Sequence, residues 1–206
     1  MRGTILSLLA LLASGPAVSA ADDVKTFPVS ACRYTLPGKD WSWVTPVPPS
    51  IQAVCMARNE DGLILMLSIL HVPPGMEIDE KFPTGFDASH AAEKGVQKRG
   101  GRLTTFKGLP CYEGEFLVHG EMTSVIRVVI ANGFAYQLQL LGNADPVEKR
   151  PDFEAIMNGF EFTSPPVPPD PHARAKARGR LFGNVVAQFL FTAIAVGLLF
   201  RWYRKK

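Results

Sequence analysis

Residues 112–121 carry three carboxylates and one imidazole at a spacing that could bind a divalent metal ion. If this stretch is one β-strand, alternate side chains point to the same face of a sheet. The four residues that share this parity are Glu113, Glu115, His119 and Glu121. Carboxylate and imidazole groups can bind divalent metals, but a solvated sheet face has the same pattern, and Gly120 interrupts the alternation. We therefore assign no metal ligand to this group.

The common catalytic signatures are missing from the sequence. It contains no H-E-x-x-H, no G-x-S-x-G, no P-loop and no dinucleotide fingerprint. His172 lies in a predicted linker, and His71 ends an apolar strand, where a structural role is the simpler interpretation. The sequence therefore predicts a protein that is not an enzyme, with no catalytic residue and no cofactor.

Three cysteines, Cys32, Cys55 and Cys111, raise the question of a disulfide. No C-x-x-C motif is present, so redox catalysis and zinc ribbons have no support. An oxidising compartment would favour one disulfide and leave one thiol. Cys32 and Cys55 lie symmetrically about residues 43–44, and a hairpin closing there would place them opposite one another. We predict a Cys32–Cys55 disulfide, and three separate buried cysteines are an equally good interpretation.

The first residues have the order of a secretory signal peptide. Arg2 supplies a positive charge, an apolar run follows, and small residues at 17–21 suit a signal peptidase. The apolar run has about ten residues, and a membrane span needs about twenty. We predict that residues 1–20 are removed after export.

Residues 181–200 form an uncharged apolar segment of the length that crosses a membrane. As a helix it would be about 30 Å long, which matches one hydrocarbon core. Four basic residues precede it within 174–180 and four follow it within 201–206, so the positive-inside rule does not orient it. The signal peptide does: we expect an inner-membrane protein with a single span, its N-terminal domain in the periplasm or outside, and a cytoplasmic tail at 201–206.

The predicted span also carries a polar stripe beside small residues. At helical spacing these residues lie along one side, and they are Gly183, Asn184, Ala187, Gln188 and Thr192. Membrane helices associate through close backbone approach and side-chain hydrogen bonds. We therefore expect the helix to associate with itself or with another membrane protein; a plain anchor is the alternative.

Residues 22–164 form the predicted globular domain, followed by a Pro-rich and then basic linker at 165–180. The predicted strands are 32–36, 51–58, 63–72, 102–107, 112–119, 122–131, 134–141 and 160–162. Predicted helices cover 79–99, ended by Gly100–Gly101, and 146–158. Asn132–Gly133 is the best hairpin signal, because both residues tolerate positive φ. The order predicts an α+β fold with a mainly antiparallel sheet flanked by helices.

Charge excludes a nucleic-acid partner. The globular part has 13 Lys and Arg against 18 Asp and Glu, a net charge of −5, and a phosphate backbone would repel it. The basic residues gather beside the predicted span, where anionic lipid attracts them.

The domain resembles the PsbP-like superfamily, which includes DcrB-like envelope proteins. The matching segments are residues 34–37 with Trp41, the Lys107-Gly108-Leu109-Pro110 turn, residues 132–136, and FEAIMNGFEF at 153–162. The resemblance spans about residues 27–163. It implies a sheet flanked by helices and a role as an accessory or binding subunit, with no catalytic residue carried over. The C-terminal apolar segment departs from the family's lipid anchor.

Three functions are compatible with these features. We favour a membrane-anchored, periplasm-facing accessory or binding subunit that supports a membrane protein complex. An envelope enzyme with a dispersed site is the second interpretation. A surface protein with a cleavable sorting tail is the third, and the absence of L-P-x-T-G and V-P-E-P motifs ranks it last.

Overall fold

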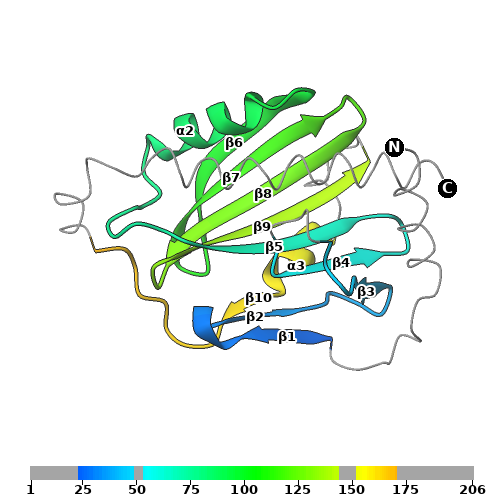
Figure 1. Ribbon diagram of the computed structural model, residues 1–206, viewed down its shortest axis with the longest axis horizontal. Coiled ribbons are helices and arrows are strands. Elements are labelled where there is room, and N and C mark those ends of the chain that lie inside the picture. Colours follow the sequence, from blue (N-terminus) through cyan, green and yellow to red (C-terminus); the bar gives the residue numbers. More distant parts are fainter. Residues whose placement is uncertain (1–22, 49–52, 144–151, 171–206) are drawn as a thin grey trace, which may run out of the picture.

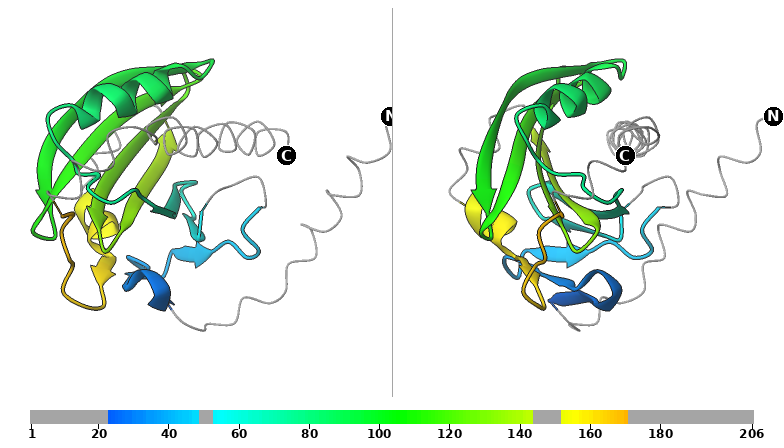
Figure 2. Two further views of the ribbon diagram at one scale, coloured as in Figure 1. Left: turned by 60° about the vertical axis from the view of Figure 1, so that its left-hand side comes forward. Right: turned by 90° about the vertical axis from the view of Figure 1, so that its left-hand side faces the viewer.

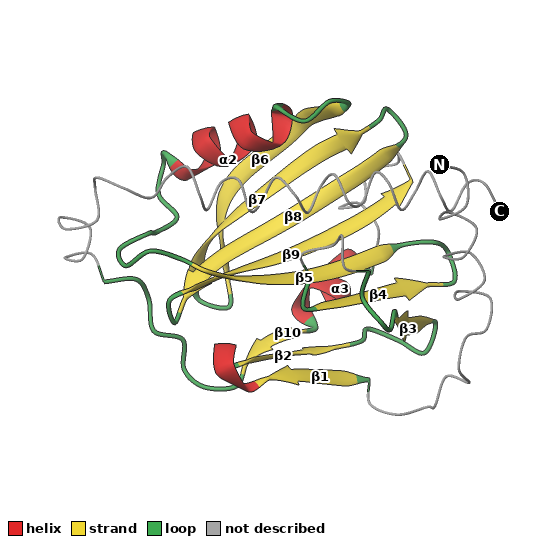
Figure 3. Ribbon diagram, in the orientation of Figure 1, coloured by secondary structure: helices red, strands yellow, loops and turns green. Residues whose placement is uncertain are grey.

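The computed structural model describes residues 23–48, 53–143 and 152–170. Within them the chain forms two antiparallel sheets and two α-helices, which confirms the predicted α+β class (Figures 1 and 3). The larger sheet contains, in spatial order, β3 (Trp41–Trp43), β4 (Cys55–Asn59), β5 (Ile64–His71), β9 (Phe134–Asn143), β8 (Met122–Ala131), β7 (Leu109–Val118) and β6 (Val96–Phe106). The smaller sheet contains β1 (Val24–Phe27), β2 (Cys32–Thr35) and β10 (Phe160–Phe162), with the short 3-10 helix η1 (Pro28–Ser30) between its first two strands.

The two faces of the larger sheet are covered by different elements. Helix α2 (Phe82–Ala91) packs on one face, over β6 and β7 (Figure 2). Helix α3 (Phe153–Asn158) and the smaller sheet pack on the other. Each face therefore has its own hydrophobic cluster, and β8 between them is buried along its whole length.

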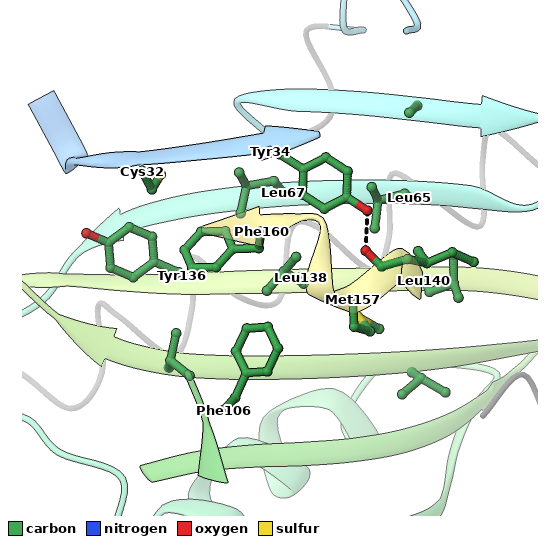
Figure 4. Close-up of a cluster of buried hydrophobic side chains, with 14 of the residues drawn as sticks. Cys32, Tyr34, Leu65, Leu67, Phe106, Tyr136, Leu138, Leu140, Met157 and Phe160 are labelled. Carbon is green, nitrogen blue, oxygen red and sulfur yellow. Dashed lines mark hydrogen bonds between the residues drawn. The ribbon is translucent and has the colours of Figure 1, made fainter. Parts of the chain in front are cut away.

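The cluster beneath α3 contains the buried rings of Tyr34, Tyr136 and Phe160 (Figure 4). Tyr34 from β2 donates its hydroxyl hydrogen bond to the carbonyl of Ile156 in α3. Tyr136 from β9 donates to the carbonyl of Ser30 at 2.5 Å. A buried tyrosine hydroxyl needs such a partner. The Tyr34 bond therefore joins the smaller sheet to α3, and the Tyr136 bond joins the larger sheet to η1.

The consecutive strands β6 to β9 are antiparallel neighbours in the larger sheet. Lys107–Gly108 and Asn132–Gly133 are two-residue turns in which both residues have positive φ. This conformation matches the twist of the flanking strands, and the Asn132–Gly133 prediction is confirmed. Between β7 and β8 the turn begins at His119, which the sequence had placed at the end of the strand 112–119.

The predicted helix over 79–99 is wrong beyond α2. The chain leaves the helix after Ala91, reverses at Gly95 with a φ of +88°, and enters β6 at Val96. Gly100–Gly101 lies inside β6 and does not end a helix. A Cβ atom on Gly101 would lie 2.3 Å from the Tyr112 hydroxyl, so this glycine makes room for an aromatic ring that packs on the sheet.

All three cysteines are buried free thiols in the cluster beneath α3. The predicted hairpin at residues 43–44 is wrong, because Trp43 pairs with Ala57 in the larger sheet while Cys32 lies in the smaller one. Cys32 and Cys55 nevertheless face the same core, and burial raises the pKa of Cys55 to about 12. Their disulfide is not formed in this structure and stays a prediction.

The segment that follows β10 is fixed to the domain over part of its length. The Val167 amide donates to Asn132 Oδ1 at 2.8 Å, and the Asn132 amide donates to the Val167 carbonyl at 2.9 Å. The first part of the predicted 165–180 linker is therefore docked on the β8–β9 turn. The chain leaves the described domain at this end of the larger sheet.

No helix among the described residues is long and apolar enough to cross a membrane. The predicted signal peptide at 1–20, the span at 181–200 with its polar stripe, and the tail at 201–206 lie outside the described residues.

One buried arginine connects α3 to the sheet. Arg127 of β8 donates to Glu113 of β7 through Nε, and to Glu154 of α3 at 2.7 Å and 3.2 Å. Its guanidinium also lies 5.3 Å from the ring of Phe106 and 5.0 Å from the ring of Phe153. Arginine suits this position, because its planar group stacks on rings while it donates along its edge.

Replacing Arg127 with Met should destabilise the domain by about 1.5–3 kcal/mol, because the hydrogen bonds between charged groups are lost and the buried Glu113 keeps only Arg102 as a partner. The control is Arg33→Met, which breaks an ion pair whose two side chains are 51% and 45% exposed and should cost at most about 1 kcal/mol. Urea unfolding of the full chain, followed by circular dichroism, measures both. Equal losses in the two variants would contradict the role given to Arg127.

Replacing Asn132 with Gly should release the segment around Val167, since the side-chain acceptor is lost while positive φ is still tolerated. Asn132→Asp is the matched control, because its carboxylate keeps an acceptor oxygen at the same place. Hydrogen exchange at the Val167 amide should be faster in the glycine variant and near the wild-type rate in the aspartate variant. Unchanged exchange in both variants would show that the bond to the Asn132 side chain does not fix the segment.

Candidate functional site

The structure does not gather the four residues of the metal hypothesis. Glu113 is buried and bonded to Arg127 and to Arg102, and Glu121 is exposed in the turn after β7. His119 lies in the same turn, with positive φ and its ring against Gly95. The shared parity ends at Val118, where the strand ends. Among the described residues no group of three His, Cys, Asp or Glu is arranged to hold a metal ion.

A different set of polar side chains is concentrated on the α2 face of the larger sheet. Five buried side-chain atoms of the described residues have no hydrogen-bond partner, and all belong to this side of the molecule. They are His90 Nε2, Glu93 Oε1, Gln137 Nε2 and Oε1, and Gln139 Oε1. Buried polar atoms are normally paired, so this group is the candidate functional site.

Strand register explains how β9 contributes to the site. Tyr136, Leu138 and Leu140 point to the α3 side, so Gln137 and Gln139 between them point to the α2 side. Gln137 lies between Ser68 of β5 and Val128 of β8 in the ladder. Ser68 and Gln137 are therefore polar neighbours on a largely apolar face.

His90 is held in one orientation near the end of α2. Its ring stacks between Phe86 at 4.2 Å and Phe116 at 4.9 Å between centroids. Its Nδ1 lies 3.0 Å from the carbonyl oxygen of Phe86, which also accepts from Ser89 Oγ at 2.6 Å. Burial lowers the pKa of His90, so the neutral ring is favoured. Since Nδ1 must donate to the carbonyl, Nε2 is left as an acceptor.

Gln139 supplies the second free acceptor. Its Nε2 donates to Ser124 Oγ of β8 at 2.9 Å, which leaves Oε1 without a partner. His90 and Gln139 are each 2% exposed. Both line a cavity of about 10 Å³ between α2 and the sheet, which is room for roughly one water molecule. The other lining residues are Val96, Phe116, Val118, Ser124, Ile126 and Leu141.

Glu93 adds a carboxyl group beside the helix end. It is 9% exposed, and burial raises its pKa to about 7. Its backbone amide donates to the His90 carbonyl at 3.2 Å, and its own carbonyl accepts from Val96 at 3.1 Å. These backbone bonds join Glu93 to His90 and Val96, which both line the cavity.

Helix α2 is fixed to the sheet through Asp87. The carboxylate accepts from the Tyr112 hydroxyl and from Lys98 Nζ, so one helix residue binds β7 and β6 together. Burial, followed by the Asp87 contact, raises the pKa of Tyr112. A Cβ atom on Gly114 would lie 3.1 Å from the Tyr112 ring, so Gly114 and Gly101 leave the space in which this ring packs.

This site was not predicted from the sequence. The strand predicted over 134–141 did not distinguish the face of Gln137 and Gln139 from the apolar face. Two amides alternating with Tyr136, Leu138 and Leu140 in a strand within a hydrophobic domain were the available signal. His90 was hidden in a predicted helix that was too long.

No protein-family model and no curated protein sequence matches the chain. Among solved structures, the solution structure of cyanobacterial PsbP (CyanoP) from Synechocystis sp. PCC 6803 matches with a TM-score of 0.53 and 14% identity. The match covers 73% of this chain and 99% of that chain. The fold is PsbP-like. The predicted PsbP-like domain is thereby confirmed as a fold, while the predicted span beside it lies outside the described residues.

Two other solved structures match the PsbP-like domain with lower scores. The Saccharomyces cerevisiae Ran-binding protein Mog1p has a TM-score of 0.45 and 8% identity, with 68% of this chain and 95% of that chain covered. LpqN of Mycobacterium tuberculosis, involved in cell envelope biogenesis, has a TM-score of 0.34 and 15% identity, with 59% and 73% covered.

The titration of Glu93 should make stability depend on pH. Its pKa is about 7 in the folded chain and near 4.5 when unfolded, so the folded state binds the proton more tightly. Its contribution is therefore complete below pH 4.5 and is lost as the pH rises to 7. His90 has the opposite sign: its lowered pKa makes the folded state less stable as the pH falls below 6.5.

The wild type should therefore lose stability as the pH rises from 4.5 to 7, and the Glu93→Gln variant should lack this loss. The difference in the free energy of unfolding between the two proteins should be largest near pH 7. Urea unfolding at several pH values measures the effect. Glu60→Gln is the control, because Glu60 is exposed in the turn after β4. A Glu93→Gln variant with the same pH profile as wild type would refute the assignment.

Proposed function

We propose that the chain is a non-catalytic accessory or binding protein whose PsbP-like domain is held at a membrane by residues 181–200. The domain faces the periplasm or another non-cytoplasmic space, and residues 201–206 stay in the cytoplasm. One observation carries the binding role: the unpaired buried polar atoms gather on the α2 face, while the ionisable groups on the α3 face are paired. Paired groups stabilise a fold, and unpaired groups are available to a ligand.

The reactive side chains of the described residues support binding over catalysis. Ser89 Oγ lies 3.4 Å from His90 Nδ1, but it donates to the Phe86 carbonyl, and His90 Nδ1 is bonded to the same carbonyl. A nucleophile needs a free base on its proton, and this arrangement supplies none. Turnover by the full chain in an activity screen would favour the alternative of an envelope enzyme.

The membrane role is supported by the sequence of 181–200 and by where the chain leaves the domain. Val167 is bonded to the β8–β9 turn, so the chain starts toward residue 181 from one end of the larger sheet. Residues 171–180 would then separate the domain from the bilayer. The polar stripe from Gly183 to Thr192 is the proposed contact with a second copy or another membrane protein.

In cells that export the chain, alkaline carbonate should leave it in the membrane, and protease added to intact spheroplasts should remove the PsbP-like domain. The matched control carries Val186→Arg and Ile194→Arg, because each central arginine opposes insertion by about 2.5–3.5 kcal/mol. That variant should appear in the soluble fraction. Extraction of the unaltered chain by carbonate, or protection of its domain from protease, would refute the membrane role.

The same membranes test association through the stripe. Replacing Asn184 and Gln188 with Leu keeps the segment apolar and removes two hydrogen-bonding groups. Chemical crosslinking should then give less of the crosslinked product than in the unaltered chain. An unchanged yield would leave residues 181–200 as a plain anchor.

A further inference from the structure

Strand β6 has the longest open edge among the described residues. It is the last strand of the larger sheet and has eleven residues, whereas the other edge strands, β3, β1 and β10, have three, four and three. Within the described part of the chain no strand pairs with its outer side, and residues 101–105 are all exposed. A long open edge presents a row of backbone groups to which another strand can be added.

The register of the β6–β7 hairpin indicates which backbone groups face this edge. Its two-residue turn is closed by Phe106 and Leu109, and such turns are closed by a hydrogen-bonded pair. Hydrogen-bonded and non-hydrogen-bonded pairs then alternate along the ladder. Thr105 is paired with Pro110, which has no N–H to donate, in agreement with this alternation. The residues that direct both backbone groups to the open edge are therefore Gly101, Leu103 and Thr105.

The first half of the edge is unsuited to pairing, and its charges oppose a second copy of the chain. The register shifts between Lys98 and Gly100, and such an irregularity interrupts a ladder. β6 contains Lys98, Arg99 and Arg102 and no acidic residue. Two copies of β6 side by side would bring these like charges together, which destabilises a strand pair. Residues 101–106 remain as a regular segment that fits a partner of opposite charge.

The side chains of this segment specify what an added strand would carry. Arg102 donates to Glu113 at 2.7 Å, yet its side chain is 67% exposed. A guanidinium has five N–H donors, so it can bind a second carboxylate. Leu103 is 43% exposed and points to the other face of the sheet. Because residues directly opposite one another share a face, an acidic residue fits opposite Arg102 and an apolar residue fits opposite Leu103.

We propose that residues 101–106 bind an extended segment of a partner protein, in which acidic and apolar residues alternate, as an added antiparallel strand. The apolar residue opposite Leu103 exchanges backbone hydrogen bonds with it, and Arg102 binds the neighbouring carboxylate. Thr104, Cys111 and Val129 form one row across the sheet, so this segment lies toward the end at which the chain leaves the domain. The proposal rests on the proposed accessory role and names a partner surface for it.

The first experiment adds a short peptide of alternating Glu and Val to the full chain in detergent. Fluorescence anisotropy of the labelled peptide should saturate, and hydrogen exchange at the Leu103 and Thr105 amides should slow. Two matched peptides should not bind: one carries Lys in place of Glu, and the other has N-methylated Val, which keeps the charge but cannot donate to the edge.

Three outcomes of this experiment would overturn the proposal. They are no binding of the Glu–Val peptide, equal binding of either matched peptide, and slow exchange at Leu103 that depends on protein concentration before any peptide is added. The last result would show that a second copy of the chain covers the edge.

Variants then assign the binding to the edge. Leu103→Pro removes one outward N–H at a place where an edge strand tolerates proline, and it should weaken binding by about tenfold or more. Arg102→Gln keeps a donor for Glu113 but loses the charge, and should weaken binding by about threefold. Arg58→Gln is the control, because Arg58 is exposed on β4, and it should bind as wild type does. If Leu103→Pro does not fold, Arg102→Gln still decides the matter.

These outcomes separate the partner surface from the proposed function. A chain that stays in carbonate-washed membranes but binds no Glu–Val peptide refutes only the β6 surface. Unchanged affinity in a folded Leu103→Pro or in Arg102→Gln refutes it as well, because the peptide would then bind elsewhere.

Discussion

Strand β8 is buried on both of its faces, and the rest of the domain is arranged around this constraint. A polar group at its centre cannot reach water, so every donor there needs a protein partner. Arg127 meets this requirement through Glu113, Glu154 and two aromatic rings. Because Glu154 belongs to α3, the same contacts fix that helix on the sheet.

The position of α3 in turn decides where the smaller sheet lies. Gly159 follows the helix directly, and its carbonyl accepts from Thr35 at 2.9 Å. A Cβ atom on Gly159 would lie 2.4 Å from the Thr35 carbonyl oxygen, so only glycine allows this close approach. β10 then pairs with β2, which brings Tyr34 beneath α3 (Figure 4). The buried Arg127 thus fixes α3, and through Gly159 and β10 the helix is joined to the smaller sheet.

The sequence predicted what depends on local patterns and missed what depends on contacts across the fold. The bounds of β8 and the Asn132–Gly133 turn were correct, because alternation and positive φ are local properties. The helix before β6 was predicted too long, because Gly100–Gly101 was interpreted as its end. In the structure Gly101 lies in β6 and leaves space for the Tyr112 ring of the neighbouring strand. Gln137 and Gln139 could not be recognised as unpaired from sequence, because pairing depends on which elements cover their face.

The geometry of β8 and β9 also relates the cavity to the point where the chain leaves the domain. Asn132, which binds Val167, lies in the turn at one end of these strands, and Ser124 and Gln139 lie toward the other. Eight residues separate Ser124 from Asn132, or roughly 26 Å at about 3.3 Å per residue. If residues 181–200 lie in the bilayer, the tethered end of the sheet is the one away from the cavity.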